Sequence, residues 1–367
     1  MTIRVHCNLC GFVPGRTGGA QVFLAGLLPE VDALPGIELT LYGSKETSKW
    51  VVESFERKPR FEIVVASSDS LANRLVAKRR LKSFCQPGEL IWSPLNQGIG
   101  QFNGVKEVVT IHDLIPLHYV RNKHSYPMNL KLRFVFWLRW TTSMRTAKRS
   151  SAVVTVSNAC VEPMKIALGK NGPPVYAAPN GLDPNKQVAA DAKRWQYSGS
   201  KTVIAVTSGT YPHKGLKTLD LVAKRLPEIE FRIVGKPSSE ISLSNVKFTG
   251  RISENELADE YRNASALFFP SRIEGFGLPV VEALYFGTPV VATDIPVLRE
   301  VGGPGSKYFE MDNIDEAVDQ LCTIIESREI SQAMSQSGIE HAAQFTWSAT
   351  AEKYHRVFEH VNSGSHP

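Results

Sequence analysis

Two glycines and two glutamates stand close together in the stretch PSRIEGFGLPVVE, residues 270–282. Gly275 and Gly277 allow backbone N–H groups to approach a ligand closely, because glycine has no side chain. The stretch then runs into a predicted helix, whose start directs about half a positive charge outward. These features predict a binding site for a diphosphate. Phosphate would repel Glu274 and Glu282, so we expect them to bind hydroxyl groups on either side of it, such as those of a sugar and a ribose.

A second loop, TSGTYPHKG at residues 207–215, contains a lysine suited to the same ligand. A nucleoside diphosphate gains negative charge as its bond to a sugar breaks, and Lys214 could neutralise that charge. His213 could add to the positive charge only when it is protonated. The alternative for His213 is a histidine at the surface of a loop with no part in binding.

His112 follows the apolar stretch 108–111, which we predict to be a strand. Ligands bind at the carboxyl ends of parallel strands, so we expect His112 to position hydroxyl groups near a sugar and its acceptor. The alternative is a histidine that only satisfies the hydrogen bonds of its own loop. The Gly-x-Gly-x-x-Gly pattern is missing after the first predicted strand, and the Walker lysine pattern and an Asp-x-Asp metal motif are also absent. The sequence therefore gives little support to a dehydrogenase or a P-loop protein, or to a site in which a metal ion bridges a diphosphate.

Short apolar stretches alternate with helical patterns along the whole chain. The stretches are rich in β-branched residues, as buried parallel strands are, and they lie at 3–5, 37–41, 63–66, 90–92, 108–111, 152–156, 203–206, 231–234, 266–269 and 290–292. The clearest helical patterns lie at 20–31, 71–81, 159–168, 216–226, 254–261, 280–285 and 314–327, with Pro279 suited to a first helical position. This alternation predicts an α/β protein with two doubly wound parallel sheets, one in each half.

The chain has 367 residues, of which 43% are hydrophobic and 21% charged, and this composition is typical of globular proteins with room for two domains. Pro-Pro and Asn-Gly pairs between residues 173 and 181 mark a boundary. We expect one domain at 1–175, a second at 176–345, and a final helix at 346–367 that packs back on the first. The chain shows no membrane-spanning stretch and no secretory signal, and its five cysteines are scattered, so we expect a cytoplasmic protein with reduced thiols.

Charge is divided unevenly, because residues 1–180 carry 23 basic and 12 acidic side chains while the remainder carries 19 and 24. Residues 121–149 hold eight basic residues and no acidic ones, interleaved with aromatic side chains. Such a helix can lie on an anionic membrane, which suggests a peripheral contact at the inner face of the membrane. Helical spacing favours instead a core position for Phe134, Trp137 and Leu138. No nucleic-acid module accompanies the basic residues, so nucleic acid is not expected as a partner.

The motifs resemble those of the retaining glycosyltransferases of family 4. Residues 270–293 are similar to the signature of this family, in which seven residues separate two glutamates. Further similarities follow one another in the family's order: Gly18-Gly19, His112-Asp113, Val156-Ser157, Asn180-Gly181-Leu182-Asp183 and Phe345-Thr346-Trp347-Ser348. The resemblance implies the GT-B fold, in which two Rossmann-like domains flank a cleft. The first domain would then face the acceptor, and the second would hold most of the nucleotide-sugar donor.

The resemblance also implies the site residues. It assigns catalytic roles to His112 and Glu274, with Glu274 on the hydroxyl groups of the transferred sugar. It assigns donor binding to Gly18, Gly19, Gly209, Thr210, His213, Lys214, Arg251, Ser271, Gly275, Phe276, Gly277, Leu278 and Glu282. Many members carry an arginine at the position of Thr210 or His213, and this sequence does not. In family members, the acceptor is thought to attack the sugar from the same face that the phosphate leaves. The departing phosphate then takes the proton of the acceptor, and the resemblance implies no metal or other cofactor.

The function implied is that of a retaining glycosyltransferase in polysaccharide biosynthesis, which moves a sugar from a nucleotide-sugar donor to a hydroxyl group of a glycan or a lipid-linked glycan. The loops at 208–215 and 112–116 look most like those of mannosyltransferases, which favours GDP-mannose, while UDP-glucose and related donors remain open. The alternatives are a GT-B epimerase or phosphorylase, and a nucleotide-sugar-binding protein without turnover. A phosphorylase would need pyridoxal phosphate and a longer chain. A protein without turnover would have lost a catalytic position, yet His112, Lys214, Glu274 and Glu282 are all present.

Overall fold

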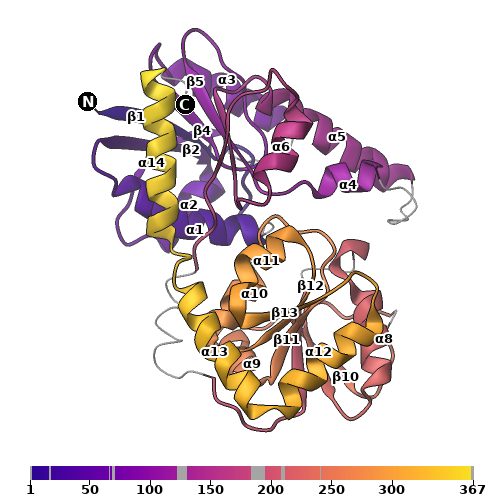
Figure 1. Cartoon of the computed structure of the whole chain (residues 1–367). Coiled ribbons are helices and arrows are strands. Elements are labelled where there is room, and N and C mark those ends of the chain that lie inside the picture. Colours follow the sequence, from indigo (N-terminus) through magenta and orange to yellow (C-terminus); the bar gives the residue numbers. More distant parts are fainter. Residues whose placement is uncertain are drawn as a thin grey trace. The chain divides into compact units, whose positions relative to one another are not determined.

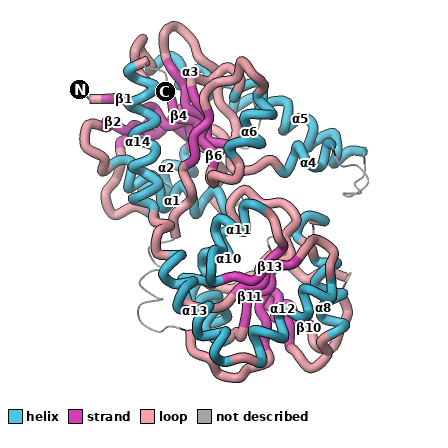
Figure 2. Tube along the Cα trace, in the orientation of Figure 1, coloured by secondary structure: helices cyan, strands magenta, loops and turns pink. Residues whose placement is uncertain are grey.

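The computed structural model describes residues 2–15, 18–65, 67, 71–121, 130–182, 195–207, 211–239 and 241–364. These residues form two compact units (Figure 1). The first unit contains the described residues of Met1–Arg121, Met128–Gly181 and Thr346–Pro367, and the second contains those of Leu182–Phe345. Figure 2 shows that in each unit the strands lie at the centre and the helices outside them.

The first unit is built on a seven-stranded parallel sheet with the order β3-β2-β1-β4-β5-β6-β7. Its strands are β1 (Ile3–Asn8), β2 (Ile37–Ser44), β3 (Arg60–Val65), β4 (Leu90–Ser93), β5 (Lys106–Ile111), β6 (Ala152–Thr155) and β7 (Val175–Ala177). The chain moves outward from β1 to β3 and then returns to the other side of β1 with β4. The direction of winding therefore changes between β1 and β4, where doubly wound sheets bind their ligands.

Six helices of the first unit follow its strands in sequence, and a seventh comes from the end of the chain. They are α1 (Gly18–Asp32), α2 (Lys45–Ser54), α3 (Leu71–Phe84), α4 (Ile115–Arg121), α5 (Leu130–Ala147), α6 (Val161–Leu168) and α14 (Trp347–Ser363). Helix α14 packs against α1, β1 and β5. The hydroxyl groups of Tyr354 and Thr110 join α14 to β5 at 2.7 Å, and Gly26 leaves the space on α1 that the ring of Trp347 occupies.

The second unit is built on a six-stranded parallel sheet with the order β10-β9-β8-β11-β12-β13. Its strands are β8 (Thr202–Val206), β9 (Glu230–Val234), β10 (Val246–Gly250), β11 (Ala266–Phe269), β12 (Val290–Thr293) and β13 (Ser306–Phe309). Its helices are α8 (Leu216–Arg225), α9 (Glu254–Asn263), α10 (Leu278–Phe286), α11 (Pro296–Gly302), α12 (Ile314–Glu326), α13 (Arg328–Ala342) and the short 3₁₀ turns η1 (Pro212–Lys214) and η2 (Gly303–Gly305). The direction of winding changes between β8 and β11.

The two parallel sheets confirm the predicted α/β fold class. Three strands were not predicted, namely β7, β10 and β13, and each lies at the edge of its sheet. They are short, and most of their side chains are only partly buried, so they lack the continuous apolar pattern of the central strands. Helix α10 begins at Leu278, two residues earlier than predicted, so Pro279 is its second residue and not its first.

Helix α5 differs from the prediction at three side chains. Phe134, Trp137 and Leu138 were expected in the core, but 60%, 45% and 47% of their surfaces are exposed. Phe136 is buried instead, and its ring lies 4.8 Å from that of Tyr119 in α4. The reason is that the N-terminal half of α5 packs against the short helix α4, and Figure 1 shows this pair extending away from the strands of the first unit.

In the described part of the chain, every helix is too short or too polar to cross a lipid bilayer.

Candidate functional site

The two glycine-containing loops predicted to bind one ligand lie side by side in the second unit. One follows β8 and the other follows β11, so both leave the sheet where its winding changes direction. The backbone N–H of Arg272 donates to the carbonyl oxygen of His213 at 2.7 Å, and the Ser271 hydroxyl donates to the same oxygen at 3.2 Å. Gly215 has a left-handed φ of 71°, and a Cβ there would collide with the carbonyl oxygen of Pro270. Glycine is therefore required for the two loops to meet.

Lys214 and Glu274 form an ion pair where these loops meet. The Nζ atom of Lys214 lies 2.7 Å from Oε1 of Glu274, and only 16% and 11% of the two side chains are exposed. Ser271 Oγ donates to the same Oε1 atom at 2.7 Å. The structure thus brings together three of the predicted donor-site residues, with one cation and one carboxylate in direct contact.

The first residue of α10, Leu278, lies four residues beyond Glu274. Gly277 precedes the helix with a left-handed φ of 101°, and a Cβ there would lie 2.9 Å from Cδ2 of Leu298. Phe276 is buried, and its ring packs edge-on against that of Phe345 with the centroids 5.5 Å apart. The side chain of Phe276 therefore belongs to the core, and only its backbone can serve a ligand together with the first N–H groups of α10.

Glu282 is buried in the second turn of α10. It is the fifth residue of α10, which starts at Leu278. Tyr261, which lies in α9, donates its hydroxyl to Oε2 of Glu282 at 2.9 Å. Burial, followed by the negative charge of Glu282, raises the pKa of Tyr261, so this hydroxyl keeps its proton. Tyr261 therefore orients Glu282, and no spacing in the sequence indicated this contact.

His213 is buried and neutral. Burial, together with the adjacent charge of Lys214 and against the opposing effect of Glu274, lowers the pKa of its imidazole to about 4. The ring of Tyr211 stacks on it with the centroids 5.8 Å apart. His213 therefore supplies no positive charge near pH 7, and its carbonyl oxygen, which accepts hydrogen bonds from the neighbouring loop, is what it contributes.

Two arginines lie near the same edge of the second sheet. Arg272 makes a bidentate ion pair with Asp312 at 2.5 and 2.9 Å, which ties the loop after β11 to the loop after β13. Asp312 has an unusual positive φ of 69°. Arg251 is exposed directly after β10, which is two strands from β8 and thus about 10 Å away. The sequence did not predict the Arg272 pair.

His112 lies after β5 in the first unit, and its ring is fixed from two sides. The Nε2 atom lies 2.6 Å from the carbonyl oxygen of Pro94, and the ring packs edge-on against Phe23 at 4.6 Å. A carbonyl can only accept, so Nε2 carries the proton of the neutral ring and Nδ1 is left as an acceptor. Burial lowers the pKa of His112, which favours this neutral form. The backbone N–H of His112 donates to Oδ1 of Asn96 at 2.6 Å.

Glu107 organises the loop that holds His112. Its carboxylate is buried and accepts from the Ser93 hydroxyl at 2.7 Å and from the backbone N–H groups of Ile99 and Gly100 at 2.8 and 2.6 Å. Burial raises the pKa of Glu107, although these hydrogen bonds oppose the shift. The only signal in the sequence was a charged residue within an apolar strand.

The remaining predicted residues divide between the two units. Gly18 and Gly19 form the start of α1 directly beyond the loop that follows β1, and Gly19 has open space at the position of a Cβ. Gly209 and Thr210 lie outside the described residues. Among the residues that the structure describes, no group of three or more His, Cys, Asp or Glu side chains could hold a metal ion.

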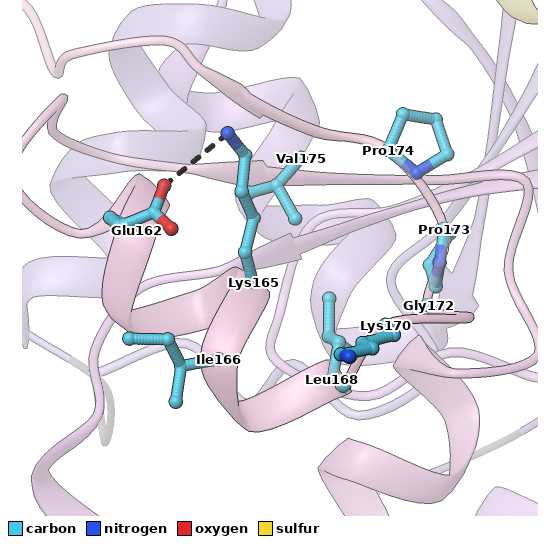
Figure 3. Close-up of a pocket in the computed structure, with 10 residues that line it drawn as sticks. Glu162, Lys165, Ile166, Leu168, Lys170, Gly172, Pro173, Pro174 and Val175 are labelled. Carbon is cyan, nitrogen blue, oxygen red and sulfur yellow. Dashed lines mark ion pairs between the residues drawn. The ribbon is translucent and has the colours of Figure 1, made fainter.

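A pocket of about 470 Å³ lies elsewhere in the first unit (Figure 3). It is lined by α6 and by the segment that precedes β7, including Leu168, Pro173 and Pro174. Glu162 and Lys165 form an ion pair of 3.4 Å at one side of it. The segment before β7 lies at the amino edge of a parallel sheet, whereas His112 lies at the carboxyl edge. This pocket is therefore not part of the candidate site.

Comparison with known proteins identifies a family for part of the chain. Residues 189–341 match the family model described as glycosyl transferases group 1. This part of the chain belongs to the glycosyl transferase group 1 family. Its match to this family lies within the second unit, which contains Lys214, Glu274 and Glu282.

Individual relatives of the chain are distant. The chain is 27% identical over 235 residues to the MMP alpha-(1->4)-mannosyltransferase of Mycolicibacterium hassiacum. The matched region covers 59% of this chain and 55% of that protein. The chain is 24% identical over 220 residues to an O-antigen chain mannosyltransferase of Salmonella typhimurium, which covers 56% and 57%. The chain thus matches about half the length of these curated relatives.

A solved structure supports the fold of the chain. The sucrose-phosphate synthase of Thermosynechococcus elongatus matches with a TM-score of 0.73 at 16% identity, over 99% of this chain and 100% of that chain. The family match and this structural match confirm the predicted family and GT-B fold class.

Proposed function

We propose that this protein is a retaining glycosyltransferase that transfers a sugar from a nucleoside diphosphate to a hydroxyl group of a glycan or a lipid-linked glycan. The observation that carries the proposal is the 2.7 Å contact between Lys214 Nζ and Glu274 Oε1 beside the start of α10. A nucleotide sugar has one oxygen between its sugar and its diphosphate. A carboxylate suited to sugar hydroxyl groups and an ammonium suited to phosphate lie next to each other, as the sugar and the diphosphate do in this ligand.

In the proposed reaction, the diphosphate binds Lys214 and the N–H groups at the start of α10. Lys214 thereby exchanges Glu274 for phosphate, and Glu274 accepts hydrogen bonds from the sugar hydroxyl groups. Glu282, oriented by Tyr261, accepts hydrogen bonds from the ribose. As the bond between the anomeric carbon and the phosphate oxygen breaks, Lys214 and the helix start stabilise the growing negative charge.

The acceptor hydroxyl group forms the new bond from the same face of the sugar. Its proton passes to the departing phosphate oxygen, so the product keeps the anomeric configuration of the donor and no catalytic carboxylate is needed as a base. The neutral His112 can accept a hydrogen bond from a substrate hydroxyl group through Nδ1, because Pro94 binds the Nε2 side.

For the donor we propose GDP-mannose. The loops around Lys214 and His112 resemble those of mannosyltransferases, and two distant relatives carry that name. UDP-glucose and related donors are the competing choices.

The experiment that tests the donor is a thermal melt of the purified protein with GDP-, UDP- and dTDP-sugars. One nucleotide should raise the melting temperature, since a ligand at 100 times its Kd adds about 2.7 kcal/mol to stability. Transfer is then measured with that donor and a lipid-linked glycan acceptor, with the exposed Glu326→Ala variant as a control for Glu274→Ala. Absence of stabilisation by every member of the panel would overturn the proposal.

A further inference from the structure

An apolar strip lies exposed on the N-terminal half of α5. The strip consists of Leu130, Phe134, Trp137 and Leu138, with 83%, 60%, 45% and 47% of their surfaces exposed. Their spacing of four, three and one residues places all four on one side of the helix. The rings of Phe134 and Trp137 stack with their centroids 5.7 Å apart. Four large apolar side chains exposed within nine residues are more than the scattered exposure of ordinary surfaces, and they mark an interaction site.

The surroundings of the α5 strip are basic. Residues 114–161 contain no Asp or Glu and eight Lys or Arg residues. Lys131 and Arg139 are exposed on α5 next to the strip. A ligand that meets this surface must therefore bury aromatic side chains and neutralise positive charge at the same time.

The other end of α5 is anchored in the fold. Met144 and Ala147 are buried in a cluster with Val109, Ile111 and Leu114. The C-terminal half is thus held by the first sheet, while the N-terminal half contacts α4 and presents the strip (Figure 1). The position of the strip is fixed by the helix and does not depend on a loop.

We propose that the α5 strip docks on the surface of an anionic lipid bilayer. Phe, Trp and Leu side chains on one face of a helix enter the boundary between headgroups and acyl chains, and flanking Lys and Arg residues bind anionic headgroups. A second copy of the same strip would bring like charges together and fits this surface less well. The inference goes beyond sugar transfer and is independent of the donor site, although a docked enzyme would lie beside a lipid-linked acceptor.

The first test is flotation of the full chain with vesicles of phosphatidylcholine alone or with added phosphatidylglycerol. The wild type should float with the anionic vesicles and not with the neutral ones, and salt should weaken the binding. Phe134→Ala with Trp137→Ala should lower the partition by at least about tenfold, and Lys131→Gln with Arg139→Gln by about fivefold for each charge. Ile166→Ala with Lys170→Gln, at exposed positions of the same unit outside α5, should leave it unchanged.

The second test is quenching of tryptophan fluorescence by brominated lipids in anionic vesicles. Trp50, Trp92, Trp195 and Trp347 are buried, and the partly buried Trp140 packs against the core cluster that contains Met144. Quenching should therefore come mainly from the exposed Trp137. Trp137→Phe should keep flotation and lose most of the quenching, which separates insertion of the strip from a general loss of folding.

Three results would overturn the proposal. They are equal flotation with neutral and anionic vesicles, flotation with neither, and wild-type flotation of the Phe134→Ala, Trp137→Ala protein. A different result would assign the strip to a second copy of the chain. In that case the wild type would sediment as a dimer and would not bind vesicles, and the same double variant would sediment as a monomer.

Discussion

Glu274 has two partners on one oxygen atom, since Lys214 Nζ and Ser271 Oγ both lie 2.7 Å from Oε1. If this carboxylate holds the sugar during transfer, Glu274→Ala should lower turnover by at least about 10²-fold, or about 2.7 kcal/mol of transition-state stabilisation. Initial rates at saturating donor concentration measure the effect, and the exposed Glu326→Ala variant serves as the control. Turnover within a few-fold of wild type would remove Glu274 from the reaction.

His213 makes stability depend on pH. Its pKa is about 4 in the folded protein against about 6.5 when unfolded, so between these values only the unfolded chain binds the proton. The neutral His213 ring therefore makes its full contribution to the stability of the folded protein above about pH 6.5. This contribution is lost as the pH falls toward 4, by at most about 1.4 kcal/mol per pH unit. His213→Asn should narrow the difference in melting temperature between pH 7.5 and pH 5. His355→Asn serves as the control, and an unchanged difference in the His213 variant would contradict the buried neutral ring.

Single residues differed in how far the sequence could predict them. Lys214, Glu274 and Glu282 stood in motifs of recognisable spacing, but the contact between Lys214 and Glu274 depends on strand order, because 60 residues separate them. Tyr261, Asn96 and Glu107 had no such spacing, since each acts through a partner from another element.

At the scale of elements, the loop between β4 and β5 depends on one buried carboxylate. Glu107→Gln keeps the shape of the side chain but replaces an acceptor oxygen with a donor, which leaves a backbone N–H of Ile99 or Gly100 without its partner. This should cost about 1–3 kcal/mol of stability. It should also lower turnover, because Pro94 and Asn96 of the same loop hold His112.

Two measurements check this prediction, a thermal melt and the affinity for the donor. The melting temperature should fall while the affinity for the donor, which we assign mainly to the second unit, stays the same. The exposed Glu56→Gln is the matched control. A melting temperature equal to that of wild type would show that the loop does not depend on Glu107.

The alternation of strands and helices predicted the central elements, because buried parallel strands leave a strong apolar pattern. The edge strands β7, β10 and β13 were not predicted, because water covers part of each strand and their apolar pattern is weak. In α5, the apolar spacing predicted a helix face in the core, but the structure shows that this face is exposed. Spacing indicates which side chains share a face of a helix, but it does not indicate what covers that face.

At the scale of the whole molecule, we expect sugar transfer without a metal ion. In the proposed reaction, Lys214 and the start of α10 supply positive charge to the diphosphate. Activity should therefore survive dialysis against excess EDTA and should not rise when Mg²⁺ or Mn²⁺ is added. A strict requirement for either ion would show that the residues assigned to the leaving group are not sufficient.

The most direct test of the central claim is a calorimetric titration of the nucleoside diphosphate of the selected donor into four proteins. The wild type and the exposed-lysine control Lys170→Gln should bind one nucleotide with equal affinity. Lys214→Gln should bind at least about tenfold more weakly, a loss of about 1.4 kcal/mol, because it removes a charge-assisted contact to phosphate. Glu282→Ala should weaken binding through the ribose. Failure of the wild type to bind any nucleotide, or wild-type affinity in Lys214→Gln, would contradict the account.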